Sequence, residues 1–148
     1  MHIRRIEAGI LNAGSDFDHT MTPFEAGFER FVDLDAGDFI GRSALVDAAR
    51  ESRLIGVRCN DPVEPLIGGT VTKDGEVIGK ITAGAVSPHL GCGTGIVRLT
   101  NTGPSAGTNV HVTALDGSLV EAELASLPLY DEAAEIPRGK KVDVPTRS

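Results

Sequence analysis

Arg5 and Glu7 are the two side chains whose types and spacing best suit recognition of a ligand. They stand two positions apart in the stretch "RRIEAGIL". A guanidinium offers a planar fork of N–H donors that suits a carboxylate or a polar ring, and a carboxylate can accept N–H bonds from a heterocycle. The alternative is an ordinary exposed ion pair, which stabilises a fold by only about 0–1 kcal/mol. The two residues alone leave both interpretations open.

The other residue types that carry chemistry form no recognised pattern. His19, His89 and His111 are far apart in the sequence, and His111 alternates with valines, which predicts an outward-facing strand position. Ser15 lacks the flanking glycines of a nucleophile elbow. The run "GCGTG" at 91–95 precedes a strand, whereas a dinucleotide loop must precede a helix. We expect no metal, triad or dinucleotide site, and interpret these glycines as a crossing loop or a close approach to another backbone.

Composition excludes several classes of partner. The chain has 148 residues, a formal charge of -7 and 4% aromatic residues with no tryptophan. Nucleic acid is therefore not an expected partner, because phosphate binding needs clustered Lys and Arg, and single strands need stacking side chains. No apolar run approaches the length of about 20 residues that spans a membrane, and no signal peptide is recognisable at the N-terminus. Cys59 and Cys92 fit neither a metal motif nor a disulfide scaffold, which favours the reducing cytoplasm.

The period of the apolar residues predicts a barrel in the C-terminal half. From residue 53 the pattern alternates, in "RLIGVRC", "GGTVTKDGEVIGKIT", "TGIVRLT" and "NVHVTALDGSLVEAELA". The pairs Asp74-Gly75 and Asp116-Gly117 separate β-branched runs, and we expect positive φ at both positions of each hairpin turn. About six strands joined in this way favour a closed antiparallel β-barrel, since closure removes exposed edges.

The first 52 residues have a different pattern and predict a helix-containing segment. Residues 3–11 suit a helix or a strand, with isoleucines at helical spacing and Gly9 as a stop, and residues 12–23 look like loop. Residues 24–34 are mixed, and residues 41–52, "GRSALVDAARES", are the clearest helix because an apolar stripe runs along it. The fold class is therefore mainly β with helices (α+β). We divide it into residues 1–52, the barrel domain 53–136, and a polar tail 137–148.

Several stretches in order resemble one known family. They are "RRIEAGILNAGSDFD", "TPFEAGFERFVDLDAGDFIGRSAL", "RLIGV", "GGTVTKDGEVIGKITAGAVSPHL" and "LPLYD". Together they are similar to the second half of the aminomethyltransferases, which include the glycine-cleavage T-protein and folate-dependent demethylases. The resemblance covers residues 3 to 131 and implies a tetrahydrofolate-dependent one-carbon transferase. It also implies that residues 1–52 are the end of the central folate-binding domain.

The resemblance assigns roles to individual residues. Arg5 matches the arginine of the "R-x-E-A-G" motif, which implies contact with the folate, and Glu7 would support it from the same motif. Tyr130, in "PLYD", matches a position near the folate on the C-terminal side. Gly84 and Ser87 match a family loop that we expect to shape the barrel. The substrate- or cofactor-binding candidates are therefore Arg5, Glu7 and Tyr130.

The sequence also departs from the family pattern. Ala13 replaces an aromatic residue, the lysine usual before "DFIG" is absent, and "T-S-G" has become Thr82-Ala83-Gly84. These changes keep open two alternatives to the glycine-cleavage reaction. One is demethylation of a sulfonium or ether substrate, and the other is a non-enzymatic folate-binding accessory role.

The N-terminal half of the family pattern is missing. In the family that half carries the catalytic aspartate and the glutamate that reads the pteridine, so the resemblance assigns no catalytic residue to this chain. We expect the full-length parent to be an enzyme and the isolated chain to be inactive. Its expected partners are the missing N-terminal half, folate and a small one-carbon donor.

Overall fold

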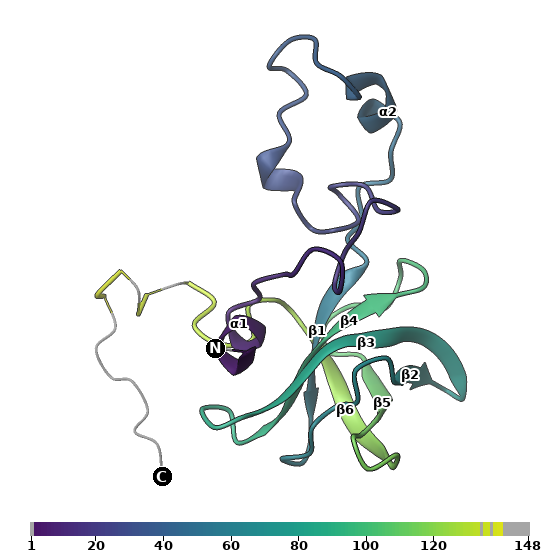
Figure 1. Cartoon of the computed structure of the whole chain (residues 1–148), viewed down its shortest axis with the longest axis vertical. Coiled ribbons are helices and arrows are strands. Elements are labelled where there is room, and N and C mark those ends of the chain that lie inside the picture. Colours follow the sequence, from purple (N-terminus) through teal and green to yellow (C-terminus); the bar gives the residue numbers. More distant parts are fainter. Residues whose placement is uncertain (1, 134, 137, 141–148) are drawn as a thin grey trace.

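A closed barrel of antiparallel strands, ordered β1-β4-β3-β2-β5-β6, forms the centre of the computed structural model (Figure 1). The structure describes residues 2–133, 135–136 and 138–140. The strands are β1 (Leu54–Cys59), β2 (Thr70–Lys73), β3 (Glu76–Ser87), β4 (Cys92–Leu99), β5 (Asn109–Thr113) and β6 (Leu119–Ala125). The predicted antiparallel barrel is confirmed. The tail predicted for residues 137–148 lies largely outside the described residues.

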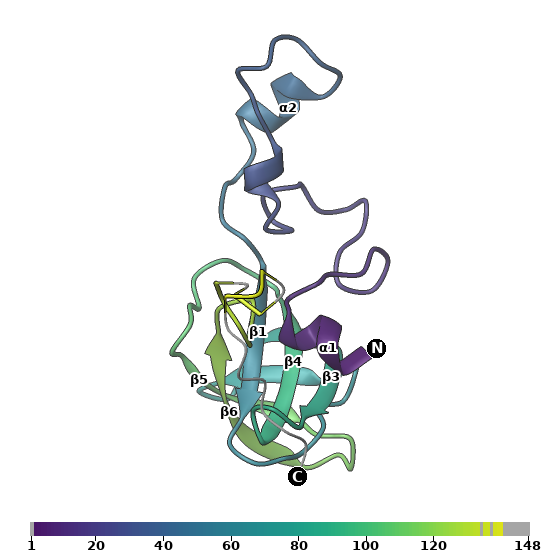
Figure 2. The same cartoon turned by 90° about the vertical axis from the view of Figure 1, so that its left-hand side faces the viewer.

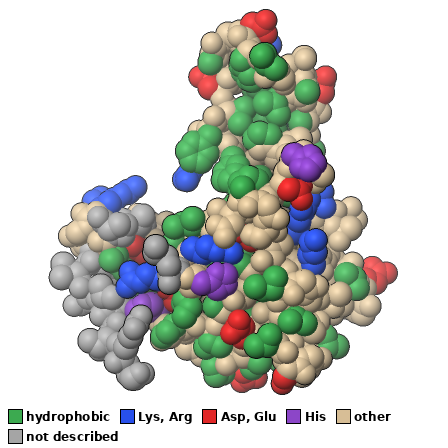
Figure 3. Space-filling view, in the orientation of Figure 1, with side chains coloured by type: hydrophobic (Ala, Val, Ile, Leu, Met, Phe, Trp, Pro, Cys, Tyr) green, Lys and Arg blue, Asp and Glu red, His purple; other side chains and the backbone are tan. Residues whose placement is uncertain are grey.

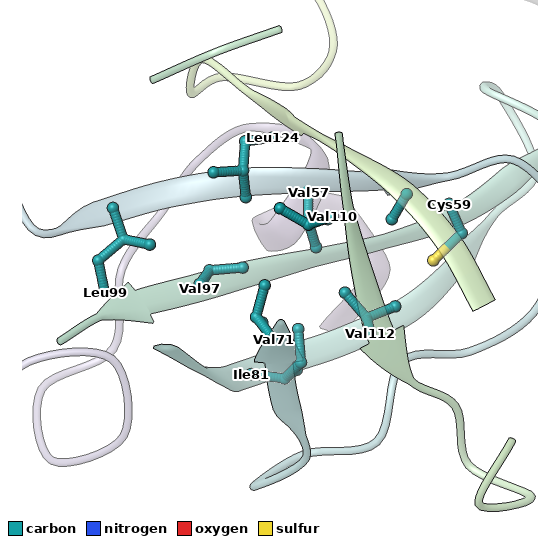
Figure 4. Close-up of a cluster of buried hydrophobic side chains, with 10 residues drawn as sticks. Val57, Cys59, Val71, Ile81, Val97, Leu99, Val110, Val112 and Leu124 are labelled. Carbon is teal, nitrogen blue, oxygen red and sulfur yellow. The ribbon is translucent and has the colours of Figure 1, made fainter. Parts of the chain in front are cut away.

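The barrel is held together by a core to which every strand contributes. The buried cluster contains Val57 and Cys59 of β1, Val71 of β2, Ile81 of β3, Val97 and Leu99 of β4, Val110 and Val112 of β5, and Ala122 and Leu124 of β6 (Figure 4). Alternate residues point inward because successive side chains of a strand face opposite sides. Pairing of β6 with β1 closes the sheet, which leaves no free edge for another chain to extend.

The two Asp-Gly turns differ. Asp74 and Gly75 both have positive φ, at 51° and 84°, as the two-residue hairpin requires. Gly117 has a φ of 85°, but Asp116 does not adopt positive φ, so this half of the prediction is wrong. The β5–β6 connection is longer than two residues, and the Asp116 carboxylate accepts the backbone N–H of Ser118 at 2.9 Å. This local hydrogen bond stabilises the turn, although the backbone of Asp116 is not in the left-handed region.

The N-terminal residues form a short helix on the outside of the barrel. Helix α1 spans His2–Glu7, which excludes the strand interpretation, and Gly9 follows it at a φ of 65°. Ile6 is 0% exposed and packs with outward-facing residues such as Ala83 and Ile96. Figures 1 and 2 show α1 against β3 and β4. The helix therefore covers one outer face of the barrel.

Residues 24–52, called the projecting segment, stand away from the barrel (Figures 1 and 2). They contain the 3-10 helix η1 (Glu29–Phe31) and helix α2 (Arg42–Val46). The helix predicted over residues 41–52 begins where expected but ends at Val46, and none of its residues is buried. A helix this short needs packing to persist, and its apolar stripe is packed only in part, with Leu45 and Ala48 half-buried and Val46 and Ala49 exposed.

Two ion pairs tie the loop after α1 and the start of the projecting segment to the barrel. Arg98 of β4 donates to Asp18 at 2.9 Å, and Arg53 donates to Glu25 at 3.3 Å. The hydrogen bond from Arg98, followed by those from Thr20, lowers the pKa of Asp18 well below its usual range. The backbone N–H of Thr22 lowers the pKa of Glu25, and Arg53 adds to this effect. Both carboxylates therefore stabilise the fold in their charged form.

Acid should weaken this attachment in a defined direction. Because the folded pKa of Asp18 lies below the ordinary value of 3.8, its stabilisation is fully present above that pH and is lost as the pH falls further. We expect the midpoint of urea unfolding to fall as the pH is lowered from about 4 to about 2, and the fall to be smaller in Asp18→Asn. An identical acid dependence in the variant would contradict this assignment.

Glycines inside β3 and β4 let the loop before β2 lie directly on the sheet. A Cβ at Gly93 would overlap the carbonyl oxygen of Val63, and one at Gly84 would overlap that of Pro65. The prediction that "GCGTG" marks close backbone approach is confirmed. The crossing-loop alternative is wrong for Gly93, which lies within β4, and only Gly91 of these glycines lies in the preceding turn.

Alanine substitutions at the neighbouring positions 91 and 93 should therefore have unequal effects. Gly93→Ala forces backbone displacement and should lower the free energy of unfolding by about 3 kcal/mol. Gly91 has positive φ but open space around it, so Gly91→Ala should cost only about 1 kcal/mol. Urea denaturation of both variants checks this. Equal losses of the free energy of unfolding would show that the close approach of Val63 to β4 does not restrict which side chain position 93 can hold.

Candidate functional site

Arg5 lies on α1 and is held by a buried carboxylate. Its Nη1 atom donates to Asp16 at 2.8 Å and to the carbonyl oxygen of Ile10 at 3.0 Å. The side chain of Arg5 is 12% exposed and that of Asp16 is 0% exposed. Removal from water strengthens the attraction, but it also makes each charge costly to leave unpaired. The guanidinium is thus fixed in orientation rather than free at the surface.

Asp16 connects three segments that are distant in sequence. Besides Arg5 of α1, its carboxylate accepts the hydroxyl of Thr82 on β3 at 2.6 Å and the backbone N–H of Asn12 at 2.7 Å. The hydroxyl of Thr82 lies 3.2 Å from the carbonyl oxygen of Ile96 on the next strand. The network therefore joins the helix, the loop after it and the barrel wall.

The network does not satisfy the buried Nε donor of Arg5. The Nε atom is buried and has no hydrogen-bond partner among the described residues. Buried polar atoms normally have partners, so an unpaired one calls for an explanation. An additional acceptor beside the guanidinium would satisfy it.

Glu7 is buried and does not pair with Arg5. It is 4% exposed, and its Oε1 accepts the hydroxyl of Ser87 at 2.5 Å. Ser87, itself 0% exposed, also accepts the backbone N–H of Leu90 at 3.0 Å. The interpretation of Arg5 and Glu7 as an exposed ion pair is therefore wrong, because each side chain has its own buried partner. Glu7 anchors α1 to the end of β3.

Tyr130 lies beside Glu7 in the segment that follows the barrel. Its backbone N–H donates to the carbonyl oxygen of Glu7 at 2.9 Å. Its ring stacks on His89, with centroids 5.3 Å apart and planes 12° apart. The preceding carbonyl, of Leu129, accepts a hydrogen bond from Arg58 of β1. The structure thus brings Glu7 and Tyr130 together, while the side chain of Arg5 is directed to a different set of partners.

A separate pocket of about 340 Å³ lies where the projecting segment meets the barrel. Four short stretches line it: Ala8, Gly9 and Leu11; Ala26, Gly27, Phe28 and Arg30; Ser52 and Leu54; and Leu127 and Pro128. The three candidates proposed from the sequence do not line it. The first stretch follows α1 directly and includes the neighbours of Ile10, whose carbonyl oxygen binds Arg5. Residues 8–11 therefore contribute both to the pocket and to the Arg5 network.

Sequence reasoning missed the partners that position these candidates. Thr82 and Ser87 belong to stretches that resemble the family, but their partners Asp16 and Glu7 lie 66 and 80 residues away, so no local spacing reveals these contacts. Asp16 lies in the stretch "NAGSD", which departs from the family pattern at Ala13. The stacking of His89 on Tyr130 depends on the fold and has no local sequence signal.

The thiols and the other histidines add no chemistry to the described part of the chain. Burial raises the pKa of Cys59 to about 11, and burial also raises the pKa of Cys92. Both thiols are free and protonated near neutral pH, which disfavours a nucleophilic role. His111 is exposed on β5, as predicted. In residues 2–133, 135–136 and 138–140, no three His, Cys, Asp or Glu side chains group closely enough to hold a metal ion.

None of the helices among the described residues has the length and apolar character that crossing a bilayer requires.

The buried Asp16 carboxylate should matter more for stability than the half-buried Asp18 carboxylate. Asp16→Asn leaves the Arg5 charge unpaired and should lower the free energy of unfolding by about 3 kcal/mol. Asp18→Asn removes a more exposed ion pair and should cost much less. Urea unfolding at pH 7 measures both variants. Similar losses in the two would mean that Asp16 does not join the three segments.

Comparison with known proteins places the barrel in a family. The family model that describes the glycine cleavage T-protein C-terminal barrel domain matches residues 52–131. An aminomethyltransferase of Streptomyces coelicolor is 35% identical over 133 residues, which cover 85% of this chain and 36% of that protein. An aminomethyltransferase of Clostridium botulinum is 37% identical over 112 residues, covering 73% of this chain and 30% of that protein.

A solved structure has the same fold. The glycine cleavage system aminomethyltransferase T of Bartonella henselae superposes with a TM-score of 0.77 at 21% identity, over 88% of this chain and 38% of that one. The matched part of this chain therefore spans about a third of the length of these relatives, between 30% and 38%. The match to the barrel model and the identity with these relatives together show that the chain belongs to the glycine cleavage T-protein, or aminomethyltransferase, family.

Proposed function

We propose that this chain is the C-terminal part of a tetrahydrofolate-dependent one-carbon transferase. In such an enzyme a methylene or methyl group passes from a small donor to a ring nitrogen of tetrahydrofolate. The observation that carries the proposal is Arg5, which Asp16 holds in one orientation while its buried Nε has no partner among the described residues. Membership of the aminomethyltransferase family supports it.

The proposal assigns different roles to the three candidate residues. Arg5 supplies fixed N–H donors to the folate, because its orientation is set before the ligand binds. Tyr130 offers a partly exposed ring beside His89. Glu7 is the least accessible of the three, and its bond to Ser87 gives it the role of positioning α1. The protein thus contributes orientation and electrostatics.

The domain boundaries follow from the same proposal. Residues 1–52 complete the preceding folate-binding domain, residues 53–136 form the barrel domain, and residues 137–148 form a tail. The catalytic acid belongs to a region that precedes this chain, so the 148 residues alone are inactive. The free thiols Cys59 and Cys92 suit a reducing compartment such as the cytoplasm.

Titration with 5-formyltetrahydrofolate tests the ligand assignment. In the full-length protein that carries this chain, Arg5→Ala should weaken binding at least tenfold, since a charged hydrogen-bond donor is lost. Arg4→Ala is the matched control, because Arg4 is exposed on the same helix, and it should leave the affinity unchanged. Circular dichroism and urea unfolding verify that both variants are folded.

Equal affinities of Arg5→Ala and the parent protein would show that the ligand has been placed wrongly. Tyr130→Leu provides an independent check at the other candidate residue and should also weaken binding. Folate binding without transfer of a one-carbon unit from any amine, sulfonium or ether donor would favour the accessory role.

A further inference from the structure

Asp131, which directly follows Tyr130, has an unusual backbone conformation. Its φ is 55°, and in the described part of the chain Asp74 is the only other residue besides glycine with a positive φ. This left-handed region costs free energy for a residue with a side chain, and aspartate is one of the few that tolerate it. The hairpin between β2 and β3 requires it of Asp74, whereas Asp131 lies in no hairpin. Its surroundings must therefore hold it in this conformation.

The carboxylate of Asp131 closes the turn that follows Tyr130. Its Oδ1 atom accepts the backbone N–H of Glu135 at 2.9 Å, and its Oδ2 atom accepts that of Ile136, also at 2.9 Å. Hydrogen bonds to an ionised carboxylate are stronger than those to a neutral oxygen. Both oxygens are thus used to fix the direction in which the chain leaves Tyr130.

The chain is also anchored before Tyr130 and at Tyr130 itself. The carbonyl oxygen of Leu129, a buried residue, accepts a hydrogen bond from Arg58 of β1. The backbone N–H of Tyr130 donates to the carbonyl oxygen of Glu7 at 2.9 Å. Three consecutive residues are therefore held by three different parts of the molecule: β1, α1 and the turn closed by Asp131.

The ring of Tyr130 makes one stacking contact and stays partly accessible. It lies nearly parallel to the ring of His89, in an offset arrangement with centroids 5.3 Å apart. Both side chains are half-buried, and Figure 3 shows exposed basic and histidine side chains on the side of the barrel where α1 lies. A single stacked pair is a weak contact, so the backbone that carries the ring must set its direction.

We propose that Asp131 is a positioning residue that fixes the ring of Tyr130 against His89 before a ligand binds, with Arg58 as a second anchor. A side chain that is ordered beforehand loses less conformational freedom on binding. The ligand at the ring is tetrahydrofolate, and only this step rests on the proposed function. Asp131 does not touch the ligand and acts through Tyr130.

Tyrosine fluorescence tests the positioning without any ligand. The chain contains one tyrosine and no tryptophan, so the signal of the full 148-residue chain comes from Tyr130 alone. Its time-resolved anisotropy should decay only with the tumbling of the whole molecule. Asp131→Ala should add a fast decay, because a released side chain moves within picoseconds to nanoseconds. Asp131→Asn should largely restore the slow decay, since asparagine tolerates the left-handed region and keeps an acceptor oxygen.

Glu132→Ala is the matched control, because Glu132 is the exposed carboxylate next in the sequence, and it should leave the anisotropy unchanged. Arg58→Ala is an independent variant and should also add the fast decay, since Leu129 loses its anchor. Circular dichroism verifies that each variant is folded. An unchanged decay in folded Asp131→Ala would overturn the proposal. If that variant does not fold, an unchanged decay in Arg58→Ala would overturn it instead.

A double-mutant cycle in the full-length protein that carries this chain tests whether Asp131 acts through Tyr130. In titrations with 5-formyltetrahydrofolate, Asp131→Ala should weaken binding about threefold to tenfold, because the ring must then be ordered on binding. In the Tyr130→Leu background the same substitution should have no further effect. Equal weakening in both backgrounds would contradict the positioning role. An unchanged affinity in Tyr130→Leu, together with the fast decay in Asp131→Ala, would contradict only the placement of folate at Tyr130.

Discussion

The buried carboxylate of Asp16 is the interaction on which the arrangement of the N-terminal residues depends. It accepts hydrogen bonds from Arg5, from Thr82 and from the backbone of Asn12, so it joins a helix, a loop and a barrel strand at one point. A charge inside a protein is tolerated only when such partners surround it, and removal of any one of them is costly. Without this point the end of α1 would keep its bond from Glu7 to Ser87, but the loop after the helix would lose its polar attachment to β3.

The barrel contributes a rigid wall rather than a cavity for the candidate residues. Its interior is filled by aliphatic side chains (Figure 4), so function must lie on the outside. α1 lies on the outer face of β3 and β4, where Glu7 meets Ser87 and the chain after β6 returns to place Tyr130 beside it. The projecting segment extends from the same region. The candidate residues and the pocket thus use neighbouring stretches of the chain, at residues 5–11 and 127–130.

The barrel could be predicted from the sequence because its signals are local. Alternating β-branched residues and Asp74-Gly75 specify strands and a turn without reference to distant residues. The end of α2 at Val46, the conformation of Asp116 and the partner of Glu7 could not be predicted in this way. The end of α2 depends on how its apolar stripe is packed, and the conformation of Asp116 depends on a side-chain hydrogen bond in the turn. The partner of Glu7 lies 80 residues away in the sequence. The resemblance predicted the family and singled out Arg5 as a candidate, but it did not reveal Asp16 as the partner of Arg5.

A double-mutant cycle between Asp16→Asn and Thr82→Val tests most directly whether this network acts as one unit. Urea unfolding of the two single variants and the double variant gives the coupling free energy. If Asp16 joins the loop and α1 to β3, the two substitutions should be non-additive by about 1 kcal/mol or more, as expected for residues in one buried hydrogen-bond network. Additivity to within about 0.5 kcal/mol would contradict the account, since α1 would then be held without a shared carboxylate.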